Sequence, residues 1–121
     1  MTDIAHVPFD EGLRRCAEGG KSLVLFSLTG CGPCDVVEAG MAEAARRPAY
    51  GDWSFAVAKV DAEDKRALGR AFKAGVNTFP NVKVVVAGEV VNSYTNVPEG
   101  WDATDVCGFL SARLDAVEAG R

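Results

Sequence analysis

Apolar residues along the chain fall into two patterns: short, nearly continuous runs, and longer stretches with apolar side chains three or four positions apart. The first pattern is typical of strands covered on both faces, and the second of helices with one buried face. The runs predict strands at residues 4–7, 22–27, 55–61, 82–86 and 90–94, and the spaced stretches predict helices at 9–16, 34–47, 64–74 and 106–117. Gly19, Pro48 and Gly75 follow the first three helices, as expected of residues that end them.

The order of these elements is β-α-β-α-β-α-β-β-α. Strands that alternate with helices favour a parallel sheet, because each helix returns the chain to the same edge. Only Ala87-Gly88-Glu89 separates the last two strands, which predicts an antiparallel hairpin at one side of the sheet. We therefore expect an α/β fold with a mixed central sheet, helices on both of its faces, and a single domain over residues 1–121.

Helical spacing also predicts which side chains face the core. In the third helix, Leu68, Ala71 and Phe72 are expected on one buried face. Cys16 and Cys107 lie on the apolar faces of the first and last helices, where a free cysteine behaves as a small hydrophobe. A regulatory or dimer-forming role stays open for either thiol if it is exposed.

Composition narrows the class of protein. The chain is 48% hydrophobic and 25% charged, an ordinary balance for a globular protein, and its formal net charge of −4 argues against nucleic-acid binding by phosphate neutralisation. No apolar run approaches the roughly 20 residues of a membrane span. The first residues lack the basic start and apolar core of a secretory signal, so we expect a cytoplasmic protein, and a monomer.

The segment Cys31-Gly32-Pro33-Cys34 carries the clearest chemical signal, because it follows an apolar strand and opens a helix. Two cysteines at this spacing can meet across one helical turn, so a disulfide forms and opens with little backbone movement. The helix N-terminus favours the first cysteine as a thiolate, the form that attacks disulfides. With one such cysteine pair and no phosphate-binding loop, we expect neither a metal site nor a cofactor.

The chain resembles the thioredoxin family at four segments: residues 31–34, 57–61, 75–80 and 88–91. The resemblance implies a thioredoxin fold, Cys31 as the nucleophile and Cys34 as the resolving cysteine of a redox disulfide. It also implies a buried Lys59 and a cis Phe79-Pro80 bond, with the Phe79 backbone available to pair with an extended substrate. The implied partners are disulfide-containing proteins and a separate reductase that supplies electrons.

Four residues depart from the family pattern. Gly30 and Ser27 stand where tryptophans are expected, and Leu25 replaces a buried aspartate that moves protons to and from the second cysteine. Asp35 follows Cys34 where a basic residue is common, and a carboxylate there favours the helix but opposes a neighbouring thiolate. These changes indicate a weakened or specialised oxidoreductase.

Glu38 has two possible roles. The stretch from Cys34 to Glu38 is similar to a thioredoxin-like branch whose helix reads Cys-x-x-Met-Glu. A glutamate on a helix is most often a solvated surface residue. The alternative is that Glu38 is the proton-handling acid that Leu25 cannot be.

The leading functional hypothesis is a protein-disulfide reductase that works by dithiol-disulfide exchange. One alternative is a thioredoxin-fold module that serves binding or assembly, because the absence of the tryptophans and the aspartate weakens catalysis. A second alternative is an oxidant or isomerase in an extracytoplasmic compartment, which the absent signal and the Gly-Pro pair disfavour.

Overall fold

The protein is described by a computed structural model that covers residues 4–120. Its elements follow the predicted order, with one additional short helix, η1. In chain order they are β1 (Ile4–Val7), α1 (Phe9–Ala17), β2 (Lys21–Leu28), α2 (Gly32–Ala45), η1 (Pro48–Tyr50), β3 (Ser54–Val60), α3 (Lys65–Lys73), β4 (Asn81–Val86), β5 (Glu89–Tyr94) and α4 (Ala103–Ala119). Among residues 4–120, no helix is long and apolar enough to cross a membrane.

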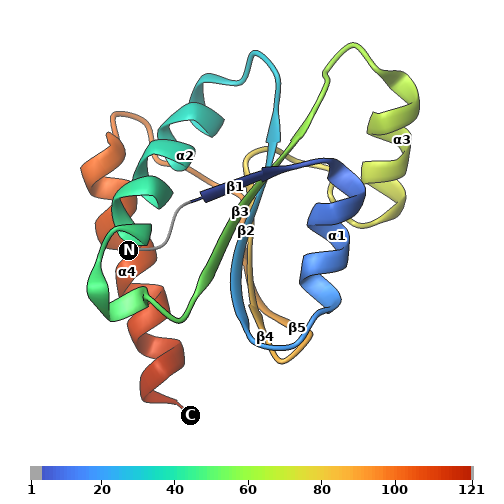
Figure 1. The fold of residues 1–121 in the computed structure, drawn as a ribbon. Helices are drawn as coiled ribbons and strands as arrows, with labels where there is room; N and C mark the ends of the chain where they lie inside the picture. Colours follow the sequence, from blue (N-terminus) through green and yellow to red (C-terminus); the bar gives the residue numbers. More distant parts are fainter. Residues whose placement is uncertain (1–3, 121) are drawn as a thin grey trace.

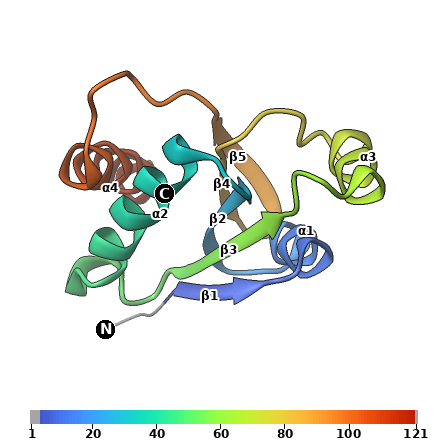
Figure 2. The ribbon, with the colours of Figure 1, turned by 90° about the horizontal axis from the view of Figure 1, so that it is seen from above.

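The five strands form one mixed sheet in the order β1-β3-β2-β4-β5. The first three are parallel, whereas β4 runs antiparallel to β2 and to β5. Figures 1 and 2 show α2 and α4 on one face of the sheet and α1 and α3 on the other. The predicted fold class is therefore confirmed: this is the thioredoxin fold, with the expected hairpin at one edge.

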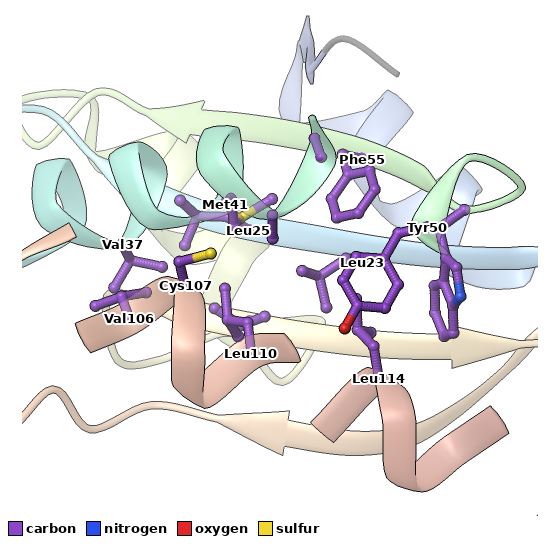
Figure 3. Close-up of a cluster of buried hydrophobic side chains, with 14 of the residues drawn as sticks. Leu23, Leu25, Val37, Met41, Tyr50, Phe55, Val106, Cys107, Leu110 and Leu114 are labelled. Carbon is purple, nitrogen blue, oxygen red and sulfur yellow. The ribbon is translucent and has the colours of Figure 1, made fainter. Parts of the chain in front are cut away.

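Alternation along β2 divides the core into two layers. Leu23 and Leu25 belong to the cluster beneath α2 and α4, whereas Val24 and Phe26 belong to the cluster beneath α1 and α3. Figure 3 shows the first cluster, in which side chains from α2 and α4 meet Leu23 and Leu25. Both faces of β2 are buried, which explains why its sequence reads as a continuous apolar run rather than an alternating one.

Close backbone packing sets the position of α2 against α4. A Cβ atom at Gly40 would lie 2.5 Å from both Cβ and Cγ1 of Val106, so glycine permits this approach. In η1, which follows the C-terminal end of α2, the hydroxyl group of Tyr50 donates to the Asp115 carboxylate at 2.7 Å. Burial, together with this hydrogen bond, raises the pKa of Tyr50. These contacts hold α2, and hence its N-terminal cysteines, in one place over the sheet.

Helix boundaries differ from the sequence-based prediction. The second helix covers Gly32–Ala45 rather than 34–47, because Cys31 already supplies its N-cap. The last helix begins at Ala103, since the side chains of Asp102 and Asp105 form a reciprocal capping box. The prediction for Phe72 is wrong: its side chain is 67% exposed. Ala67 and Ala71 form the buried face of α3, and the next residue after Ala71 is turned about 100° away from it.

Candidate redox site

The cysteine pair lies at the N-terminus of α2, as expected. Cys31 is the N-cap residue, and Gly32 and Pro33 occupy the first turn, where a missing N–H leaves no helical hydrogen bond unmade. The backbone N–H of Cys34 donates to Cys31 Sγ at 3.2 Å. The two cysteines form a disulfide, with their Cα atoms 5.3 Å apart. Local helix geometry therefore brings the sulfurs together without a distant contact.

The two sulfurs differ in their access to solvent. Cys34 is fully buried at 0% exposure, whereas Cys31 is half-buried at the helix end. An incoming thiol or disulfide therefore meets Cys31 first. The backbone N–H groups of the first turn also favour negative charge at this end of the helix. The geometry suits an accessible nucleophile followed by a shielded resolving thiol.

Phe79 and Pro80 lie between α3 and β4, and the peptide bond between them is cis, as the resemblance implies. Pro80 is buried, and Phe79 is half-buried against the cluster beneath α1 and α3. Pro80 borders a small cavity that Val37 of α2 also lines, so the proline lies close to the helix that carries the cysteines.

Leu25 and Lys59 show how far the interior beneath the site departs from the family pattern. Leu25 is 0% exposed and belongs to the apolar cluster, so the place expected for a buried carboxylate is hydrophobic. The expectation of a buried Lys59 is wrong, because its side chain is exposed. Burying an ammonium group without an anionic partner costs several kcal/mol or more. Leu25 carries no negative charge that could pair with a buried Lys59.

Gly30 has a backbone reason to be glycine. Its φ angle is +74°, in the left-handed region, and no other part of the described chain lies within 4 Å of a Cβ built there. A tryptophan at this position would have room, but its backbone would be strained by about 1–2 kcal/mol. The absent aromatic side chain therefore accompanies a turn geometry that favours glycine.

Asp35 and Glu38 border a groove of about 400 Å³ between β1 and α2. Asp35 is exposed, whereas Glu38 is half-buried, so Glu38 is not a fully solvated surface residue. Its Oε1 atom is buried and accepts no hydrogen bond from residues 4–120. His6 and Arg46 line the same groove, which no sequence motif indicated because its two walls are far apart in the chain.

The other two cysteines are free. Cys107 is buried, with its Sγ 3.9 Å from the Ser111 hydroxyl oxygen, and Cys16 is half-buried. Burial raises the pKa of the Cys16 thiol, although the positive charge of Lys83 partly offsets this effect. The described residues contain no group of three or more His, Cys, Asp or Glu side chains suited to a metal ion. Redox chemistry at Cys31 and Cys34 is the chemistry that this geometry supports.

Comparisons with known proteins agree with this geometry. The family model described as Thioredoxin matches residues 2–103. Thioredoxin Mala s 13 of Malassezia sympodialis has a TM-score of 0.68 at 17% identity, and the match covers 96% of this chain and 91% of that chain. Thioredoxin from Trypanosoma brucei brucei has a TM-score of 0.66 at 20% identity, and the match covers 97% of this chain and 92% of that chain.

A third solved structure is a complex of ferredoxin:thioredoxin reductase with thioredoxin f2. The matching chain has a TM-score of 0.69 at 19% identity, and the match covers 96% of both chains. No curated protein matches. At these identities the solved structures establish a shared fold.

Proposed function

This chain belongs to the thioredoxin family, and we propose that it is a thiol-disulfide oxidoreductase that reduces protein disulfides. The observation that carries the proposal is the Cys31–Cys34 disulfide at the N-terminus of α2, with one cysteine accessible and the other buried. A pair that forms and opens inside one helical turn can take up and release two electrons while the rest of the fold stays in place.

The reaction proceeds in two exchanges. The Cys31 thiolate attacks one sulfur of the substrate disulfide, a mixed disulfide forms, and the other substrate sulfur leaves as a thiolate that takes up a proton. Cys34 then loses its proton and attacks Cys31 Sγ, which releases the second substrate thiol and leaves the Cys31–Cys34 disulfide. The substrate has gained two electrons and the protein has lost two.

A separate reductase completes the cycle by returning two electrons to the disulfide. A similar chain is known in complex with a reductase, which supports a partner of this class here. We propose that the backbone of Phe79, beside Pro80, pairs with an extended segment of the protein substrate, as a strand edge does. We expect the chain to act as a monomer, and in the cytoplasm.

The trapping of a mixed disulfide tests this proposal. Replacing Cys34 by serine should leave Cys31 able to attack a substrate disulfide, but no thiol remains to resolve the mixed disulfide. A covalent complex with a disulfide-containing protein should therefore accumulate. The complex should be visible by non-reducing electrophoresis and mass spectrometry, and should disappear on addition of dithiothreitol. The double variant Cys31→Ser/Cys34→Ser is the control; a complex formed equally by the double variant would point to Cys16 or Cys107 and contradict the proposal.

We further propose that Glu38 accepts the proton of Cys34 in the second exchange. Cys34 and Glu38 are four residues apart on α2, so their side chains lie on the same side of the helix, one turn apart. The buried, unpaired Oε1 of Glu38 is available as an acceptor, and the groove between β1 and α2 gives the carboxyl group a route to solvent water. Leu25 provides no competing acid from the sheet side.

Replacing Glu38 by glutamine should slow the second exchange, because a general base contributes roughly 10²-fold or more to a proton transfer. The measurement is the rate at which a preformed mixed disulfide on Cys31 resolves, followed by quenched-flow mass spectrometry across pH 5–9. The loss should be largest at low pH, where few Cys34 thiols ionise unaided. Glu43→Gln, on the same helix, is the control, and an unchanged resolution rate in Glu38→Gln would remove Glu38 from the mechanism.

A further inference from the structure

Ser27 is a buried polar residue with no evident structural role. Its side chain is 0% exposed, and its hydroxyl oxygen has no hydrogen-bond partner anywhere in residues 4–120. Leaving a buried hydroxyl group unpaired is destabilising, so most such groups are either satisfied or absent from cores. The structure holds the protein in its oxidised form, with Cys31 and Cys34 joined. The Ser27 hydroxyl group is thus unpaired in the form in which neither cysteine carries a free thiol.

The face of the sheet on which Ser27 lies follows from strand alternation. Side chains two residues apart on a strand share a face, so Ser27 lies on the same side as Leu23 and Leu25. That side is covered by α2 and α4, and Figure 3 shows Leu25 directed towards α2. Ser27 therefore faces the helix that begins with the cysteines, and it is closer than Leu25 to the end of β2 from which that helix is reached.

Register places Ser27 beside the site along the sheet. The antiparallel pairing of β2 and β4 ends at Phe26 and Asn81, which are the chain neighbours of Ser27 and Pro80. Pro80 shares a cavity with Val37, one turn after Cys34 on α2. The loop after β2 is short, and the Cys31 N–H donates to the Leu28 carbonyl oxygen at 3.3 Å. The buried side of the first turn of α2 thus lies over the end of β2.

From this placement we infer that the Ser27 hydroxyl group donates a hydrogen bond to Cys34 Sγ when the disulfide is reduced. In the oxidised structure neither sulfur of the disulfide pairs with the Ser27 hydroxyl group. Two-electron reduction breaks the S–S bond and leaves Cys34 as a thiol or a thiolate, and a buried thiolate is a strong acceptor. Lys59, the residue of β3 that pairs with Ser27 of β2, is exposed and supplies no buried donor to Cys34 instead.

The proposed hydrogen bond should change the dithiol-disulfide equilibrium constant. A contact present in the reduced form alone stabilises that form, so Ser27 shifts the dithiol-disulfide equilibrium towards reduction. Removing the hydroxyl group should lower the equilibrium constant for reduction by about tenfold, which corresponds to a midpoint potential about 30 mV more negative. Removal of the unpaired hydroxyl from the oxidised form acts in the same direction.

The test is the redox equilibrium of Ser27→Ala in glutathione buffers, with the free thiols quantified by alkylation and mass spectrometry. Ser22→Ala is the matched control, because Ser22 is a buried serine on the same strand but on its opposite face. Urea unfolding of both redox forms is the second measurement: Ser27→Ala should lower the stability of the reduced form relative to the oxidised form.

Equal changes in both redox forms, with an unchanged equilibrium constant, would show a merely structural serine and overturn the inference. This inference rests on the proposed function, but the two fail differently. If the wild-type pair does not equilibrate with glutathione at all, the oxidoreductase proposal fails. If it equilibrates and Ser27→Ala behaves as wild type, only the role of Ser27 fails.

Discussion

Replacing Cys31 by serine is expected to reduce protein-disulfide reductase activity to the uncatalysed background. A serine hydroxyl group is not ionised near neutral pH and cannot form a disulfide, so neither exchange can begin. Cys34 cannot substitute for it, because its side chain is fully buried. The measurement is the rate of insulin reduction with dithiothreitol as the electron source, compared with a reaction that contains no protein.

Cys16→Ser is the matched control for loss of a thiol, because Cys16 is a free, half-buried cysteine on α1, on the opposite face of the sheet from α2. It should retain full activity. Circular dichroism and thermal unfolding of Cys31→Ser should match those of the reduced wild-type protein, which separates lost chemistry from lost folding. If Cys31→Ser were as active as the wild-type protein, the alternative of a thioredoxin-fold binding or assembly module would be favoured.

The direction of electron flow is a separate question from activity. A reductase needs a potential low enough to reduce its substrates, and a typical thioredoxin has a potential of about −270 mV. A measured midpoint of about −120 mV would instead favour an oxidant or isomerase. The midpoint potential of the Cys31–Cys34 pair therefore decides between a reductase and an oxidant.

Local patterns predict most of this fold because β2 and β3 are buried on both faces and the helices have regularly spaced apolar residues. The order of nine elements follows from hydrophobic spacing, and the Cys-x-x-Cys spacing alone places the sulfurs within bonding reach. Helix ends are less predictable. The capping box between Asp102 and Asp105 depends on side-chain geometry that a propensity for polar residues does not reveal.

Interactions between distant segments account for what the sequence did not reveal. Lys59 matches a family segment, but whether a lysine is buried depends on a partner 34 positions earlier, at Leu25. The groove beside Glu38 forms only when β1 reaches α2, and the isolation of the Ser27 hydroxyl depends on every neighbour that could have paired with it. Each of these features belongs to tertiary packing, so a strand or helix pattern cannot encode it.

Replacing Leu25 by aspartate is expected to destabilise the fold by at least about 3 kcal/mol at neutral pH. The substitution removes a leucine that is 0% exposed and places a carboxyl group in an apolar cluster that offers it no cation. Burial raises the pKa of such a carboxyl group above the unfolded value of about 3.9, so the native state favours its protonated form. The measurement is urea unfolding of Leu25→Asp and wild type between pH 3 and pH 8.

The sign of the pH dependence separates charge burial from simple loss of packing. Well below the unfolded pKa of about 3.9 the group is protonated in both states, and the destabilisation should be smallest. As pH rises through the unfolded pKa, the unfolded state loses its proton first, so stability relative to wild type should fall by up to about 1.4 kcal/mol per pH unit until the native pKa is reached. Leu25→Asn is the control, since it has the same shape and no titration, and its deficit should stay constant. Equal stability of Leu25→Asp and Leu25→Asn at pH 8 would contradict this expectation. It would mean that Lys59 turns inward to pair with the new carboxylate, so that Leu25 alone is the reason why Lys59 is exposed.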